Sequence, residues 1–388
     1  SKIVKILIAV FAVCLIAPAF SAVENVKVGG DIAVWGVLRG EFVAYNKLYT
    51  GFSQARVYVS ADLSENVQTM VRLINERVWD STKDNLKTGI SLDLAYIKVS
   101  DLLAPGLSIT LGRQEIELGE GLVVGSRYHK DLTNYPGLSA LTDLGLQKAF
   151  DAVRIDYGAE GLPIQLTAFY SQIKESGNNP DEKLFGVDLG VGVADLAKVD
   201  LYYVGNIEKR EGNVDDIYTF GLRTVIGVPA VSGLSLKAEY AKQFKDSKGW
   251  ALLAGIKYES ETNLKPWVKL NYARFSDEWT DIYPSNIASR VGPTLYASGN
   301  ALNNSTLRNL NTVNLGVGIS PAEKWAVSLD TYWVDRIGAN NTLGYDVNLG
   351  IEYKHTEDLT FGLTGGKVFA GDLDKKPWQI LSYAKIAF

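Results

Sequence analysis

The side chains that could carry catalytic or metal chemistry in this chain are few. The only histidines are His129 and His355, and the single cysteine, Cys14, lies in an apolar stretch near the start. Neither histidine has a serine or carboxylate partner at a recognisable catalytic spacing, and two distant histidines do not assemble a metal cluster. The sequence therefore predicts no enzyme active site, no metal and no cofactor.

Charged side chains instead recur at alternate positions along segments that are otherwise apolar. An apolar–polar period of two is typical of a β-strand whose faces meet different surroundings. The polar faces carry the candidate cations Arg39, Arg56, Arg154, Arg223, Lys237, Lys257 and Lys269. They also carry the candidate anions Asp31, Asp156, Asp188, Asp200, Glu239, Asp330, Asp346 and Glu352. Such charges set ion preference where a pore narrows. Alternatively, most of them pair across neighbouring strands and only stiffen a wall.

The elements that position these charges are strands, and about 18 of them follow one another along the chain. In the clearest, polar or small residues alternate with Tyr345, Val347, Leu349, Ile351 and Tyr353. An aromatic at each end of the apolar row is typical of the interfacial girdles of a membrane barrel. We expect strands near 26–43, 51–62, 66–79, 88–100, 106–118, 150–158, 163–173, 183–194, 198–206, 216–227, 233–244, 249–259, 264–275, 310–320, 323–335, 344–355, 358–368 and 376–388.

The connections between these strands alternate between short and long. This alternation predicts that both termini are periplasmic, with short turns on that side and longer loops outside. Two connections, 119–149 and 276–309, are unusually long and have no obvious structure. Loops of this length are usually functional, and we expect one of them to fold into the lumen.

Residues 1–22 are predicted to be a cleavable signal peptide, which leaves 23–388 as the barrel. Lys2 and Lys5 precede an apolar stretch that ends in small residues. The alternative, an anchor helix, needs roughly 20 apolar residues without an early proline such as Pro18. Removal of the two lysines takes the formal net charge from −5 to −7, which argues against a nucleic-acid partner.

Composition and strand pattern together predict an all-β, transmembrane, antiparallel barrel in the outer membrane of a bacterium. A mean hydropathy of zero is too polar for a helical membrane protein. A barrel of 18 strands is roughly 36 Å wide, too wide for wall side chains to fill. The terminal Phe388 resembles the signal that such barrels present to the barrel-assembly machinery. The expected partners are that machinery, outer-membrane lipid and lipopolysaccharide. The sequence does not decide between a monomer and a homo-oligomer.

The strand near 106–118 holds the most specific local signal. Its apolar residues change parity, from Leu107, Ile109 and Leu111 to Ile116 and Leu118. Both sets face lipid only if one extra residue enters the strand, and Gly112 is the natural β-bulge. The residues that then point into the lumen are Arg113, Glu115 and Glu117. Alternatively, the strand ends at Leu111 and Arg113 lies among the lipid headgroups.

The run LGRQEIELG at 111–119, followed by FDAVR at 150–154, resembles the alginate-export family of outer-membrane barrels. Barrels of that family have an arginine-rich constriction that passes an anionic polysaccharide. The resemblance implies that Arg113 and Arg154 are constriction residues.

Three functions fit this sequence. We expect a passive channel, or porin, for small hydrophilic solutes or ions. The second possibility is an export channel of the alginate type, which needs a continuous cationic path and a periplasmic partner. The third is a barrel that serves as a sheath or scaffold for a protein partner.

Overall fold

The computed structural model describes residues 24–43, 46–79, 89–125, 141, 143–144, 149–158, 161, 163–174, 181–194, 196–210, 213–299, 307–337, 341–371 and 373–388. The predicted signal peptide and His129 lie outside these described residues.

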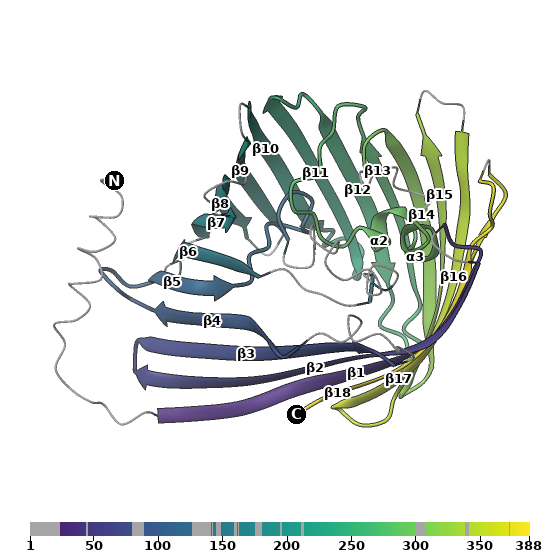
Figure 1. Cartoon of the computed structure of the whole chain (residues 1–388), viewed down its shortest axis with the longest axis horizontal. Helices are drawn as coiled ribbons and strands as arrows, with labels where there is room; N and C mark the ends of the chain where they lie inside the picture. Colours follow the sequence, from purple (N-terminus) through teal and green to yellow (C-terminus); the bar gives the residue numbers. More distant parts are fainter. Residues whose placement is uncertain are drawn as a thin grey trace.

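Eighteen antiparallel strands close into a single barrel (Figure 1). Each strand pairs with its neighbours in sequence, and β1 (Glu24–Gly40) closes the ring against β18 (Trp378–Ala387). This closing pair runs without a register shift from Asp31 opposite Ala387 to Gly40 opposite Trp378. This closure gives the backbone N–H and C=O groups of the first and last strands hydrogen-bond partners, as a lipid environment requires. The predicted antiparallel barrel is confirmed.

The other strands lie close to the predicted ranges. They are β2 (Lys47–Ser64), β3 (Val67–Val78), β4 (Ser91–Val99), β5 (Leu107–Gln114), β6 (Phe150–Tyr157), β7 (Ile164–Lys174), β8 (Asp181–Val193), β9 (Ala197–Arg210), β10 (Asn213–Gly227), β11 (Leu234–Lys245), β12 (Trp250–Glu259), β13 (Trp267–Phe275), β14 (Leu310–Ala322), β15 (Trp325–Arg336), β16 (Asn341–Lys354) and β17 (Leu359–Phe369). Two short helices, α2 (Ala288–Val291) and α3 (Pro293–Ala297), lie between β13 and β14 and inside the ring of strands (Figure 1).

The outer face of the wall is apolar. On β14, Val317 is 42% exposed whereas Asn314, on the opposite face, is 2% exposed. On β15 and β16 the outward row has an aromatic pair at each end, Trp325 with Tyr353 and Trp333 with Tyr345. Rows of exposed apolar side chains between aromatic ends are stable against lipid rather than water, which makes this a transmembrane barrel.

Both ends of the described chain lie at the end of the barrel that holds the turns at 65–66 and 323–324. Phe388 N–H donates to Gly30 O there, at 3.0 Å. The strand ends that flank the long connections 115–149 and 276–309 lie at the opposite end. The expected strict alternation is wrong. β9 and β10 pair as far as Arg210 and Asn213, which leaves two residues between them at the long-loop end. The connection 246–249, also at that end, is shorter than 228–233 and 260–266 at the other end.

Candidate functional site

Segments of both long connections, not of one, fold into the barrel. Residues 115–125 follow β5, and residues 276–299 carry α2 and α3. The two segments hydrogen-bond to each other, since Tyr283 N donates to Val123 O at 2.9 Å and Ser285 N donates to Gly121 O at 2.8 Å. We call these two segments together the plug.

The plug packs against the wall through an apolar core inside the lumen. Its buried side chains include Ile116, Leu122, Val124, Tyr283 and Leu295. On the wall side they meet an apolar cluster that includes Phe150, Phe169, Leu184 and Tyr202. Each such side chain contributes roughly 1.5–3 kcal/mol when it leaves water. The plug is therefore a packed part of the fold, and the lumen is narrowed to the space beside it.

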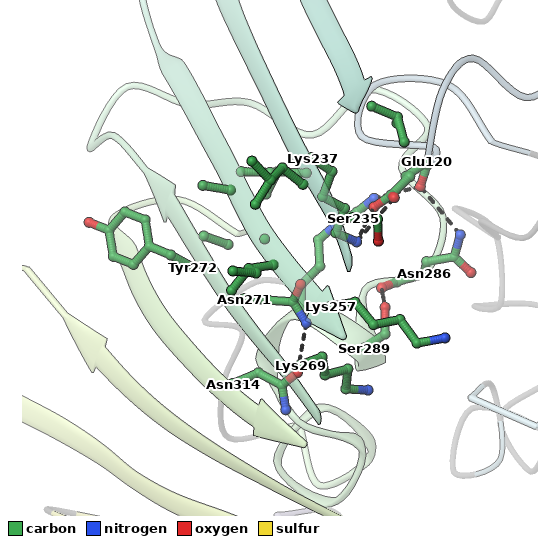
Figure 2. Close-up of a pocket in the computed structure, with 18 of the residues that line it drawn as sticks. Glu120, Ser235, Lys237, Lys257, Lys269, Asn271, Tyr272, Asn286, Ser289 and Asn314 are labelled. Carbon is green, nitrogen blue, oxygen red and sulfur yellow. Dashed lines mark hydrogen bonds and ion pairs between the residues drawn. The ribbon is translucent and has the colours of Figure 1, made fainter. Parts of the chain in front are cut away.

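A cavity of about 450 Å³ lies between plug residues 286–290 and the inward faces of β10 to β14 (Figure 2). We call it the basic cavity, because the charged side chains lining it are five cations and one carboxylate: Arg223, Lys237, Lys257, Lys269, Arg290 and Glu120. Lys257 and Lys269 face each other directly across β12 and β13. Like charges in this position repel, so an anion that entered between them would be stabilised.

The wall cations of the basic cavity all have carboxylate partners. Lys237 Nζ lies 2.9 Å from Glu120, Lys269 Nζ 2.8 Å from Asp330, and Arg223 Nη1 2.9 Å from Asp200. Lys257 pairs with Glu259 on the same strand. The alternative of pairing across neighbouring strands holds for Arg223 alone, because Glu120 belongs to the plug, Asp330 lies two strands away on β15 and Glu259 lies on the same strand as Lys257. The three lysine pairs are partly exposed to solvent and therefore contribute little to stability.

Arg290 differs from the wall cations. Its guanidinium donates to two carbonyl oxygens, Ser285 O and Glu120 O, and no carboxylate among the described residues forms an ion pair with it. Burial lowers the pKa of Arg290 from its usual value. Sequence reasoning missed this residue, because it lies on a short helix in a long connection and outside any alternating pattern.

A second cavity, of about 720 Å³, lies on the other side of the plug, against β1, β2, β16, β17 and β18. Four carboxylates and two cations line it: Asp31, Asp143, Glu352, Asp358, Arg56 and Lys385. We call it the acidic cavity. The exposed plug residues Asn286 and Ser289 line both cavities. The tip of the plug therefore separates a basic side of the lumen from an acidic side.

Other predicted lumen residues also point inward and are paired. Arg56 binds Asp31 at 2.9 Å, and Arg39 binds Asp143 of the first long connection. Arg154 Nη2 lies 2.8 Å from Asp156 Oδ1. The remaining predicted anions are in lumen contacts as well: Asp188 lies near Asp200, Glu239 accepts from Tyr202, Asp346 accepts from α3, and Glu352 lines the acidic cavity.

The two glutamates that follow the Arg113 motif lie in the lumen. Glu115 accepts from Arg72 Nη2 at 2.6 Å and lines a cavity of about 220 Å³ together with Arg154. Glu117 accepts from the Ser285 hydroxyl at 3.2 Å. Arg72, on β3, was missing from the predicted cations although it lies on the polar face of an alternating strand.

The predicted β-bulge at Gly112 is wrong, and so is the inward position of Arg113 that depended on it. β5 pairs with β4 and β6 through Gly112 without a register shift, even though Gly112 has a φ of +118°. Arg113 therefore keeps the parity of Leu111 and Ile109, on the outward face. There its Nη1 lies 3.0 Å from Asp151 Oδ2, and both side chains are partly exposed.

The part of the chain that the structure describes contains no group of three or more His, Cys, Asp or Glu residues that could hold a metal ion. No helix among these residues is long and apolar enough to cross a membrane.

Comparisons with known proteins bear on the fold. No protein-family model and no curated protein sequence matches the chain. The resemblance of residues 111–119 and 150–154 to the alginate-export family is not supported.

Solved structures of outer-membrane porins are similar to this barrel over almost its whole length. Pseudomonas aeruginosa OccK8 (OprE) matches with a TM-score of 0.63 at 10% identity, over 94% of this chain and 98% of that one. OpdQ of the same organism matches with a TM-score of 0.63 at 11% identity, over 94% and 98%. OccK2 (OpdF), solved in complex with glucuronate, matches with a TM-score of 0.62 at 9% identity, over the same fractions. The fold of this chain is that of these porin barrels.

Proposed function

We propose that this protein is a porin of the bacterial outer membrane, through which small hydrophilic solutes pass passively. The observation that carries the proposal is the plug tip at Asn286 and Ser289, which has a polar cavity on either side within a closed barrel. Polar and charged side chains line both cavities, so the space beside the plug favours water and small hydrophilic solutes. The porin fold shared with OccK8 and OpdQ supports the same function.

The charge of the basic cavity refines this proposal toward anionic solutes on that side of the plug. Five cations line the basic cavity, and three of them lie in a row on adjacent strands: Lys237, Lys257 and Lys269. Fixed charges in a constriction raise the local concentration of ions of opposite sign. We therefore infer that small carboxylates pass faster than uncharged solutes of the same size.

The plug supports a channel for small solutes over the two alternatives. A sheath for a threaded protein needs an empty lumen, whereas here apolar side chains such as Leu122 and Tyr283 fill part of it. Export of a polyanion needs a continuous cationic path, whereas the wall lysines and Arg223 are matched by carboxylates. We propose neither an enzymatic role nor a cofactor. As partners we propose outer-membrane lipid and lipopolysaccharide, and the assembly machinery through the exposed Phe388.

A liposome-swelling assay tests the proposed function. Purified protein in vesicles should allow swelling in small sugars and fail to do so in large oligosaccharides. Glucuronate should enter faster than glucose, which is similar in size but uncharged, because the cations of the basic cavity attract the glucuronate carboxylate. Vesicles that do not swell in any small solute, although the barrel is folded, would contradict the proposal.

A further inference from the structure

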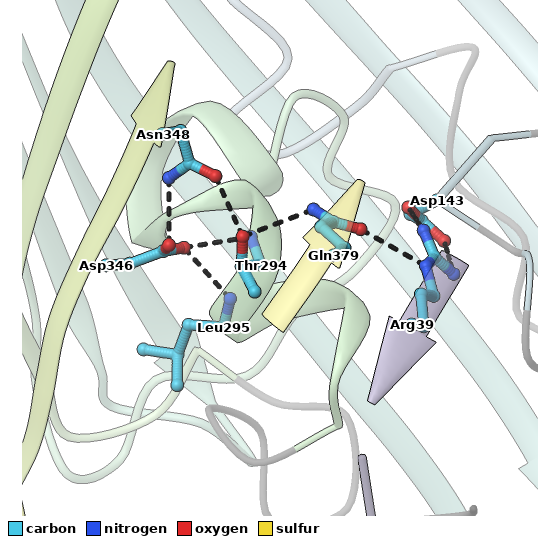
Figure 3. A network of polar contacts seen from close by, with 7 residues as sticks. All are labelled: Arg39, Asp143, Thr294, Leu295, Asp346, Asn348 and Gln379. Atoms are coloured by element: carbon cyan, nitrogen blue, oxygen red, sulfur yellow. Dashed lines mark hydrogen bonds and ion pairs between the residues drawn. The ribbon is translucent and has the colours of Figure 1, made fainter. Parts of the chain in front are cut away.

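A buried chain of polar contacts joins the plug to the place where the barrel closes (Figure 3). Arg39 of β1 and Gln379 of β18 face each other across the closing pair of strands, and Arg39 Nε donates to Gln379 Oε1 at 3.1 Å. Gln379 Nε2 in turn donates to Thr294 Oγ1 of α3 at 3.3 Å. The seam between the first and last strands therefore contacts the plug segment 276–299.

Arg39 also holds the connection between β5 and β6. Its Nη1 donates to Asp143 Oδ1 at 3.0 Å and its Nη2 donates to Asp143 Oδ2, which makes a bidentate ion pair (Figure 3). The Arg39 side chain is fully buried and that of Asp143 is 10% exposed. Removing one partner of a buried pair leaves a buried charge without compensation, so the loss of either Arg39 or Asp143 should be destabilising.

Asp346 of β16 also binds α3, through hydrogen bonds to its backbone. Its Oδ2 accepts hydrogen bonds from Thr294 N at 2.8 Å and from Leu295 N at 2.9 Å (Figure 3). A Cβ at Gly292 would lie 2.4 Å from that oxygen, and the φ of Gly292 is +96°, so glycine is needed at this approach. The helix that follows the plug tip is thus fixed to the wall at its first turn.

We propose that Arg39 and Gln379 are positioning residues, which form one seam anchor for both long connections and thereby set the width of the pore. Each residue belongs to one of the two strands that close the barrel. The constriction therefore forms only when β1 and β18 pair in register. This inference rests on the proposed channel function and identifies the residues that place its narrowest part.

The test measures plug mobility and conductance in the same set of variants. A spin label is attached at Ser289→Cys, at the exposed plug tip, in a chain that also carries Cys14→Ser. Arg39→Gln should increase the label's mobility and raise the single-channel conductance of the unlabelled protein. Asp143→Asn should do the same, although Asp143 belongs to the other connection, because both connections share the anchor. Arg77→Gln, which removes an exposed arginine from β3, should change neither.

A folded Arg39→Gln protein with wild-type label mobility and conductance would overturn the anchor. If Arg39→Gln does not fold, Asp143→Asn decides, since it leaves the β1–β18 pair intact: a mobile label supports the anchor, and an unchanged label overturns it. A wild-type protein that does not conduct would overturn the channel function instead, and the label mobility would still decide on the anchor.

Discussion

The proposed preference for anions depends on the charge pairs in the lumen. Lys257 and Lys269 face each other on adjacent strands, and each has its own carboxylate partner, Glu259 and Asp330. A half-exposed pair of this kind contributes at most about 1 kcal/mol to stability. Under the proposed function, removal of these lysines should therefore affect permeation more than folding.

The first prediction concerns these two lysines. Lys257→Gln with Lys269→Gln should move the reversal potential in a salt gradient toward cation preference, since Glu259 and Asp330 lose their counter-charges. The shift should decrease in high salt, because fixed charges in water are screened over about 10 Å at 0.1 M. Lys324→Gln, at the turn between β14 and β15, serves as the control. Equal reversal potentials in the double variant and the wild type would contradict the role of the basic cavity.

The second prediction concerns Arg113 and Arg154, which the sequence places together and the structure separates. Arg113→Ala should leave ion selectivity unchanged, because this side chain pairs with Asp151 on the outward face. The loss of stability should be about 0–1 kcal/mol, as for other exposed pairs. Arg154→Ala should shift the reversal potential toward cation preference, because Arg154 lines a lumen cavity. A shift in Arg113→Ala as large as that in Arg154→Ala would show that Arg113 faces the pore.

Strands were predictable at the scale of elements because their two faces meet two different media. The row of Leu349 and Ile351 on β16 repeats every second residue, so the pattern is visible without any tertiary contact. The end of β5 was not predictable in this way. Ile116 and Leu118 change parity because they lie beyond the strand and enter the plug core. Apolar residues in this protein are buried either against lipid or in the plug core, and the pattern of one sequence does not distinguish these two environments.

The plug itself could not be predicted from local pattern. Its hydrogen bonds join Gly121 with Ser285 and Val123 with Tyr283, which are far apart in the sequence. Length alone indicated that one long connection enters the lumen. Both long connections enter the lumen because they pack against each other. The same packing places Arg290, which sequence reasoning missed, at the edge of the basic cavity.

The third prediction tests the assigned faces of β17. Leu363→Arg puts a charge on the lipid face, two residues from the aromatic end at Phe361. It should cost up to about 2 kcal/mol in the free energy of folding into lipid vesicles, because the roughly 2–4 kcal/mol cost at the bilayer midplane falls toward the interface. Thr364→Arg, one residue away, faces the lumen and should cost less. Urea titrations of both variants in vesicles measure the difference. Equal losses would mean that the face assignment of this strand is wrong.

The fourth prediction concerns pH and the plug. Burial raises the pKa of Asp281 to about 6, above its ordinary value, despite hydrogen bonds from Trp279 Nε1 and Leu307 N. A raised folded-state pKa means that the folded protein favours the neutral acid. The stabilisation is therefore complete below about pH 4 and is lost as the pH rises through about 6.

Urea midpoints between pH 4 and pH 7 measure this effect. The wild type should lose stability relative to Asp281→Asn as the pH rises, because asparagine cannot ionise. Parallel pH profiles for the two proteins would show that Asp281 does not titrate in this range.

At the scale of the whole molecule, the pairing of β1 with β18 determines both the wall and the position of the plug. The β1–β18 pair completes the wall, and the same pair carries Arg39 and Gln379, which contact the connections that narrow the lumen. A barrel that closes in this register thus acquires its wall and its constriction together. The apolar outer face fits lipid and the two polar cavities beside the plug fit water, which is the division that the proposed conduit across a membrane requires.

Single-channel recording of the purified protein in planar lipid bilayers tests this central claim most directly. The account predicts discrete current steps of one main size, and a reversal potential in a potassium chloride gradient that favours chloride. A folded barrel that inserts into the bilayer and passes no current would contradict the account.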